Sequence, residues 1–144
     1  MTRHVETIVI EIAAPPERVW AVMTDFARWP EWTASVQSIE PLDTGAVRIG
    51  WRVRIRQPKL PPAVWKLVEF EPGRQFIWRS GLPGMRVFAA HTIEPTAIGS
   101  RVTLAVNYRG LLSKLLAWMT RDITQRYLDM EASGLKKQSE VRSN

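Results

Sequence analysis

The hydrophobic period changes near residue 110 of this chain of 144 residues, and that change limits the folds that it can adopt. Between residues 47 and 108, apolar side chains recur at every second position within short segments, which is typical of strands with one buried face. From residue 112 to residue 134 they recur at every third or fourth position, which is typical of an amphipathic helix. Because a sheet with one apolar face has to cover that face, the sequence predicts a sheet packed against a long final helix.

The expected order is one strand, two short helices, six strands and one long helix. The first strand covers residues 4–12. Pro16 then opens a helix that runs to Thr24, and Asp25 is expected to cap a second short helix that Pro30 ends. The later strands lie within residues 35–44 and at 47–55, 63–71, 75–80, 85–93 and 101–108, and the final helix covers 111–136. Short turns between the strands predict an antiparallel meander.

Length and composition limit the kind of protein. The chain is expected to form one domain over residues 1–144, with an ordered core over 3–138. It has no cysteine and two histidines, which excludes disulfides, cysteine nucleophiles and an all-histidine zinc site. Glycine motifs for nucleotides and the G-x-S-x-G motif are absent, so neither a metal nor a cofactor is expected. With no membrane-length apolar run and no recognisable signal peptide, the expected location is the cytoplasm.

Positive charge is concentrated in the middle of the chain. Residues 48–86 carry nine basic and two acidic side chains, within a formal net charge of +6. Arg48, Arg52, Arg54 and Arg56 alternate with apolar residues, so the favoured interpretation is a solvated sheet face. Aromatic side chains that would stack on bases are missing from that face, and phosphate contacts alone bind weakly. Nucleic acid is therefore not an expected partner.

The final helix is expected to cover the sheet with one stripe of side chains. That stripe comprises Leu112, Leu116, Met119, Ile123, Tyr127, Met130 and Gly134, and Leu128 lies largely opposite. Leu111 and Trp118 are apolar but lie off the stripe. Packing against the turns at 58–62 or 82–84 is the favoured explanation, and a dimer contact or a membrane contact is the alternative.

Tryptophan is frequent, with seven residues, and its placement bears on function. Trp51 and Trp78 are expected on the inner face, with Trp65 and Trp32 near it, where an indole is either core or a flat wall for a ligand. Trp20 and Trp29 are expected to pack the short helices onto the sheet. His91 lies on an apolar strand face, where it is either a polar anchor or base, or a core histidine bonded to a neighbour such as Tyr108.

Two further features depend on strand registers that the sequence leaves open. If the strand at 63–71 turns Glu69 inward, that carboxylate would form a proton-transfer pair with His91. Ser38 and Ser80 would point inward in one of two registers. Apart from Glu69, the carboxylates occupy expected turns or outer positions, so the sequence predicts no acid–base pair.

Several of these segments resemble a known family. Val19-Trp20, the stretch Thr24-Asp25-Phe26-Ala27-Arg28-Trp29-Pro30-Glu31-Trp32, the turn Glu71-Pro72-Gly73-Arg74 and His91-Thr92-Ile93-Glu94-Pro95 are similar to the polyketide cyclase/dehydrase-like group of the START-like (SRPBCC) superfamily. The resemblance covers about residues 3–138. It implies an α+β helix-grip fold, in which a curved seven-stranded antiparallel sheet surrounds a C-terminal helix and a hydrophobic cavity.

The expected function is the binding or carriage of a small hydrophobic ligand that is lipid-like, polycyclic or of polyketide type. The expected ligand contacts are Trp32, Trp51, Val53, Trp65, Trp78, Val87, His91, Tyr108, Met119, Ile123 and Tyr127. The alternative is a cyclase or dehydratase that acts on a poly-carbonyl chain, with His91 or Tyr108 moving a proton. A third hypothesis is a protein-interaction module that uses the arginine face. Stable membrane insertion is not expected, and a homodimer is left open.

Overall fold

The computed structural model describes residues 3–141, and its centre is one antiparallel sheet in the order β1-β7-β6-β5-β4-β3-β2. The strands are β1 (Arg3–Ile12), β2 (Ser38–Pro41), β3 (Arg52–Arg56), β4 (Ala63–Glu71), β5 (Gln75–Leu82), β6 (Met85–Thr96) and β7 (Gly99–Gly110). The helices are α1 (Pro16–Thr24), the 3-10 turn η1 (Phe26–Arg28), α2 (Trp29–Trp32), α3 (Ser113–Met119) and α4 (Arg121–Glu140). The expected α+β fold is therefore confirmed. The ends of the expected domain, 1–2 and 142–144, lie outside the described residues.

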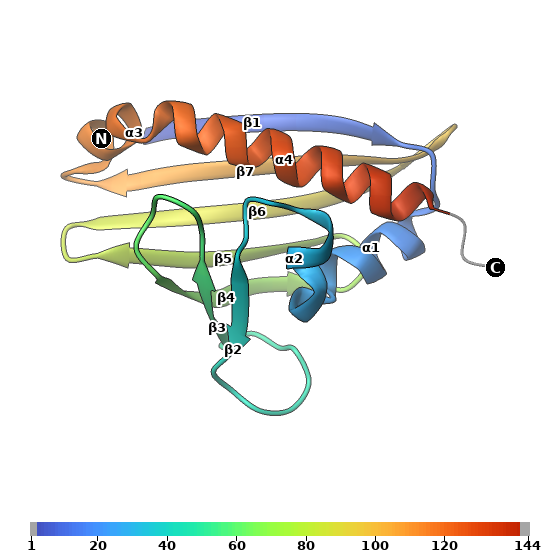
Figure 1. Cartoon of the computed structure of the whole chain (residues 1–144), viewed down its shortest axis with the longest axis horizontal. Coiled ribbons are helices and arrows are strands. Elements are labelled where there is room, and N and C mark those ends of the chain that lie inside the picture. Colours follow the sequence, from blue (N-terminus) through green and yellow to red (C-terminus); the bar gives the residue numbers. More distant parts are fainter. Residues whose placement is uncertain (1–2, 142–144) are drawn as a thin grey trace.

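One long helix crosses the sheet. Figure 1 shows α4 in front of the strands, with α1 and α2 near its C-terminal end and α3 at the opposite end. Beneath it, alternation along β7 buries Val102, Leu104 and Tyr108 and leaves Arg101 exposed. β1 pairs with β7 along its whole length, so the first and last strands are neighbours. The period of two thus places the apolar face of the sheet under the helix.

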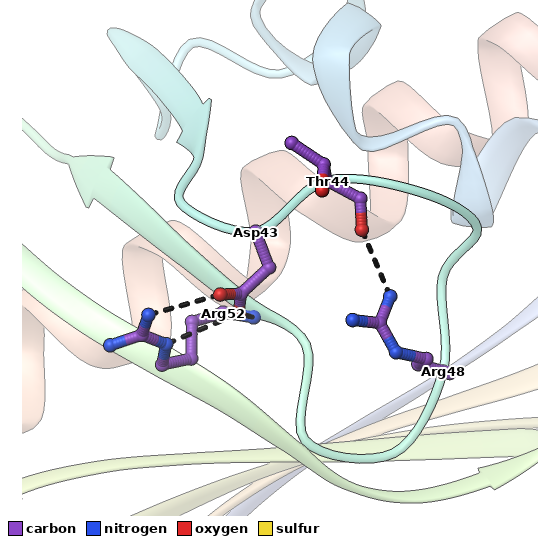
Figure 2. Close-up of polar contacts among 4 residues, drawn as sticks. All are labelled: Asp43, Thr44, Arg48 and Arg52. Carbon is purple, nitrogen blue, oxygen red and sulfur yellow. Dashed lines mark hydrogen bonds and ion pairs between the residues drawn. The ribbon is translucent and has the colours of Figure 1, made fainter.

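The strand expected at residues 47–55 begins later, because its first part is a loop. Gly50 has a φ of 95°, which favours glycine, and Ile49, expected on the buried face, is 64% exposed. Figure 2 shows how the loop is held: Arg52 lies 3.0 Å from the Asp43 carboxylate, and Arg48 donates to the carbonyl oxygen of Thr44. The hydrogen bond from Arg52 lowers the pKa of the Asp43 carboxyl. β3 consequently starts at Arg52.

The continuous final helix expected over 111–136 is wrong, because α3 and α4 meet at a break at Thr120. Thr120 has a ψ of 7°, and its hydroxyl donates to the carbonyl oxygen of Leu116. The buried residues of α4 are Leu128, Ala132, Leu135 and Ser139. Leu128, expected opposite the stripe, is thus in the core, and Met119, expected on the stripe, is 66% exposed. The buried positions of α3 and α4 keep one helical phase across the break, so the expected stripe was displaced around the helix and the break is not the cause.

Tryptophans attach the short helices to the sheet. Pro30 lies in the first turn of α2 instead of ending a helix, a position where its missing N–H costs nothing, and Asp25 makes no side-chain capping bond. The Trp29 indole N–H donates to the carbonyl oxygen of Met23 at 3.1 Å, which joins α2 to α1. Trp20 packs against two phenylalanine rings of the sheet. The roles expected for Trp20 and Trp29 are confirmed.

The C-terminal half of α4 lies very close to its neighbours. At Gly134 the helix meets the backbone of α2 so closely that a Cβ would collide with the carbonyl oxygen of Trp32. Farther along, Glu140 accepts hydrogen bonds from the Ala13 amide at 2.8 Å and from Lys136 at 2.6 Å. The Lys136 ammonium, followed by the Ala13 amide, holds the pKa of the Glu140 carboxyl below its usual value. This end of the helix is therefore fixed against both α2 and β1.

Replacing Gly134 tests this close approach. In an ordinary helix interior, glycine to alanine stabilises by about 1 kcal/mol. Here Gly134→Ala is expected to lower the free energy of unfolding by about 1–3 kcal/mol, because the new methyl group overlaps the Trp32 backbone. Urea denaturation of the variant and the wild type measures the change. Ser133→Ala, at the adjacent exposed position, is the control and is expected to be neutral or slightly stabilising. A stabilised Gly134→Ala variant would contradict the close contact.

Candidate functional site

A cavity of about 520 Å³ lies between the sheet and the final helices. Its apolar walls come from the sheet, from the β3–β4 loop and from α3 and α4. The lining includes Val36, Ile55, Leu60, Pro61, Pro62, Met85, Val87, Ala89, Leu104, Val106, Leu116 and Leu128. Cavities of a few hundred to about 1,000 Å³ with mostly apolar walls suit small organic ligands. The interior of the domain is therefore hollow on this side of α4.

Aromatic rings make the flattest part of the wall. Trp29, Trp65 and Trp78 all line the cavity. The rings of Trp29 and Trp78 have centroids 5.3 Å apart, and those of Trp65 and Trp78 are 6.2 Å apart. Phe26 packs behind Trp78 at 5.0 Å. Because each indole is supported by another ring, the wall is rigid and presents a broad apolar surface.

One polar pair interrupts this apolar surface. Nε2 of His91, on β6, lies 2.9 Å from Oε2 of Glu131, on α4, and both residues line the cavity. The His91 side chain is 4% exposed and the Glu131 side chain 16%. The imidazole stacks on Phe76 with centroids 4.2 Å apart and meets the edge of Trp78. Packing on both sides fixes the ring so that it presents Nε2 to the carboxylate.

The two nitrogens of His91 differ in their surroundings. With Glu131 ionised, Nε2 carries hydrogen and donates to the carboxylate, which leaves the neutral ring with its lone pair on Nδ1. Nδ1 is buried and has no hydrogen-bond partner among the described residues. Because Nδ1 is out of reach of a ligand, the more exposed Glu131 carboxylate is the member of the pair that can anchor a polar group or accept a proton.

Two tyrosines connect the helices to the cavity wall. The Tyr108 hydroxyl lies 2.8 Å from the hydroxyl of Thr124 and 3.3 Å from that of Thr120. The Tyr127 hydroxyl donates to the carbonyl oxygen of Pro58, in the β3–β4 loop. Burial raises the pKa of Tyr127, opposed by the charge of Arg126, so this phenol stays protonated and remains a donor at neutral pH. These bonds hold α4 and the loop around the cavity.

The structure brings together about half of the expected ligand contacts. Those that line the cavity are Trp65, Trp78, Val87, His91, Tyr108 and Tyr127. Trp51 and Val53 lie in the core away from it, and Trp32 packs beside Trp29 at 5.3 Å. Met119 is exposed, and Ile123 is half-buried outside the lining. Ligand contact by any of them stays a prediction.

The expected partners of His91 are corrected by the geometry. Glu69 is exposed next to an irregularity in the β4–β5 pairing, so it does not face His91. Tyr108 bonds to the threonines of α4 and not to the imidazole. The carboxylate beside His91 is that of Glu131 instead, a contact that the sequence did not predict. Ser80 lines the cavity, whereas Ser38 is exposed.

A periodic signal for the missed residues was present in the sequence. Thr120, Thr124, Tyr127 and Glu131 follow one another at spacings of four, three and four, which is the period of a helix. All four line the cavity. This polar stripe lies beside the apolar stripe that enters the core, so α4 has two inward faces with different chemistry. Trp29 also lines the cavity, although the sequence predicted only that it packs a short helix onto the sheet.

Most arginines of the arginine face form salt bridges or hydrogen bonds within the chain. Arg54 pairs with Glu40 at 2.8 Å, and Arg52 pairs with Asp43 (Figure 2). Arg48 donates to the carbonyl oxygens of Thr44 and Ala46 in the same loop. These contacts connect β3 to the segments that precede it. They give the arginines a structural role and weaken the case for a separate protein-binding face.

The His91–Glu131 contact is expected to contribute measurably to folding. Glu131→Leu should lower the free energy of unfolding by about 1–3 kcal/mol, because the buried imidazole loses its partner. The double variant His91→Phe, Glu131→Leu should lose less free energy of unfolding than the sum of the losses in the two single variants. Urea denaturation of the four proteins completes the double-mutant cycle. Strict additivity would mean that the two side chains do not interact.

Comparisons with known proteins support the fold. The family model described as polyketide cyclase/dehydrase and lipid transport matches residues 3–140. Among solved structures, the Zhui aromatase/cyclase from Streptomyces sp. R1128 is 14% identical, with a TM-score of 0.78 over 96% of this chain and 94% of that one. A START superfamily protein from Mycobacterium smegmatis is 14% identical, with a TM-score of 0.77 over 95% and 97%. At such identities the structural likeness shows the fold alone. No functionally curated protein matches the sequence.

Proposed function

Because the chain belongs to the polyketide cyclase/dehydrase and lipid transport family, we propose that its cavity binds a small hydrophobic ligand with one polar end. The resemblance noted in the sequence is thereby confirmed at the level of family and helix-grip fold. The observation that carries the proposal is an apolar cavity of about 520 Å³ that holds one buried polar pair. A ligand that matched both features would gain apolar burial along the walls and orientation from the pair.

The walls suggest how such a ligand would lie. Trp65 and Trp78 offer flat surfaces to a ring system or to an acyl chain. His91 and Glu131 would receive a hydroxyl, phenol or carbonyl group at the far end from α3. In this proposal, Tyr108 and Tyr127 keep the enclosing helix in place and contact the ligand mainly through their rings. Lipid-like, polycyclic and polyketide-type molecules all have this pattern of one polar end on an apolar body.

The proposal includes a setting for this activity. Within residues 3–141, no helix has the length and apolar character needed to cross a membrane. We take the cytoplasm as the site of action and a single ligand-binding domain as the working unit. Nucleic acid is not a partner in this proposal, since Arg48, Arg52 and Arg54 bind groups within the chain.

Filling the cavity tests the proposal. Val87→Trp adds an indole to the lining of the cavity, so it is expected to weaken binding of a fluorescent fatty acid by about tenfold or more. Val5→Trp adds the same volume at a half-exposed position of β1 and should leave binding unchanged. Titration of each protein, followed by ligand fluorescence, gives the dissociation constants. The wild type is also titrated with a panel of fatty acids, sterols and flavonoid-like molecules. If it binds none of them, the carrier proposal fails.

A second candidate function is catalysis, which the His91–Glu131 pair favours. The structurally similar Zhui protein is named an aromatase/cyclase, and a poly-carbonyl chain would fit a cavity of this kind. The Glu131 carboxylate, hydrogen-bonded to His91, would remove a proton from a carbon between two carbonyl groups. The resulting enolate carbon would form a bond with a second carbonyl carbon, whose oxygen would then take up a proton. Confinement of the chain would supply much of the rate.

If the protein is a catalyst, turnover should require the carboxylate charge of Glu131. Glu131→Gln keeps a hydrogen-bonding side chain but removes the carboxylate charge, so turnover of a poly-β-carbonyl thioester should fall by about a hundredfold or more. Affinity for a non-reactive analogue should change by about threefold or less. Asp129→Asn, an exposed carboxylate on the same helix, is the matched control. Loss of binding in proportion to turnover would assign the pair to anchoring alone.

A further inference from the structure

α3 and the two residues before it present large apolar side chains to the solvent. The exposed fractions are 93% for Leu111, 53% for Leu112, 54% for Leu115, 74% for Trp118 and 66% for Met119. Together these residues are called the α3 apolar face. The other side of the helix is anchored, since Ser113 and Ala117 are buried. The packing against neighbouring turns that the sequence favoured is therefore wrong for Leu111 and Trp118.

The α3 apolar face lies at one end of the cavity. Leu116, on the inner side of the same helix, lines the cavity, as do Pro61 of the β3–β4 loop and Met85 at the start of β6. Figure 1 shows α3 at the end of the sheet where the β5–β6 hairpin turns. A molecule bound to this face would thus be separated from the cavity by α3, the β3–β4 loop and the turn of the β5–β6 hairpin.

Basic side chains surround the α3 apolar face. Between residues 109 and 121 the chain has three basic residues, Arg109, Lys114 and Arg121, and no acidic residue. Arg86 pairs with Arg109 in register across β6 and β7, and all four side chains are exposed. Among the described residues, none of the four takes part in a salt bridge. The exposed carboxylate of Asp122 also lies beside Trp118, Met119 and Arg121, but the four basic side chains outnumber it, so the surroundings of the face are net positive.

We infer that the α3 apolar face docks on the surface of a lipid bilayer that contains anionic lipids. Leucine, methionine and tryptophan side chains enter the interface between headgroups and acyl chains, and lysine and arginine around them bind lipid phosphates. A second copy of this chain is the rival occupant. A symmetric dimer would bring two net positive surfaces together around the contact, which disfavours it. The inference adds a surface to the proposed cavity and needs no ligand for its test.

Vesicle flotation tests the docking surface with the full chain. The wild type is expected to float with vesicles that contain about 30% phosphatidylglycerol in phosphatidylcholine, and to bind pure phosphatidylcholine about tenfold less or weaker. Leu111→Ala combined with Trp118→Ala should reduce binding to the anionic vesicles by about tenfold or more. Ile98→Ala removes another exposed apolar side chain, 61% exposed in the β6–β7 turn, and should bind as the wild type does. Arg121→Gln should weaken binding about fivefold, with less effect at higher salt.

Three results would overturn the inference. One is a wild type that remains with the unbound fraction for both kinds of vesicle. Another is equal loss of binding in Ile98→Ala and in the double variant, which would indicate nonspecific adsorption. The third is a dimer, seen by analytical ultracentrifugation, that dissociates in the double variant and does not bind vesicles. Cavity binding of a fluorescent fatty acid is measured separately in solution, so its outcome and that of flotation are distinguishable.

Discussion

The close contact between α4 and α2 determines where the domain is solid and where it is hollow. Gly134 approaches the Trp32 backbone without room for a methyl group, and Leu135 beside it is completely buried. The α4 residues that line the cavity all precede this point, from Thr124 to Glu131. At the other end of the sheet, α3 is anchored by its buried residues Ser113 and Ala117. The cavity occupies the space between the sheet and the part of α4 that precedes Gly134.

A space of this kind persists only if its walls resist collapse. Aromatic rings supply part of that resistance, since Phe26, Trp29 and Trp78 support one another at centroid distances of 5.0–5.7 Å. Hydrogen bonds supply the rest, since Tyr127 joins α4 to the β3–β4 loop and Tyr108 joins β7 to α4. These polar bonds are shielded from water, which makes each more costly to break. The polar stripe of α4 thus maintains the cavity that it lines.

The sequence predicted the architecture well, because period two and period 3.6 are local properties of the chain. The prediction failed for features that depend on contacts between residues far apart in the sequence. The break at Thr120 accompanies a contact between its hydroxyl and that of Tyr108 on β7, which a continuous apolar stripe does not reveal. The partner of His91 lies forty residues away in sequence, on a helix whose inward face the apolar stripe misidentified. The site was therefore predicted in part: the expected residues on β5 and β6 line the cavity together with Tyr127, whereas Trp51 and Val53 at β3 and Met119 and Ile123 of the helices do not.

The positions of the polar pair and of the α3 apolar face favour one direction of entry. Glu131 lies eleven residues beyond Thr120, which is about 16 Å along the helix axis. His91 likewise lies deeper along β6 than Met85 and Val87, which line the cavity near α3. An amphiphile in a bilayer turns its polar group toward the water and toward any docked protein. Such a molecule would enter with its polar end leading and its apolar body following, which delivers that end to His91 and Glu131 without inversion.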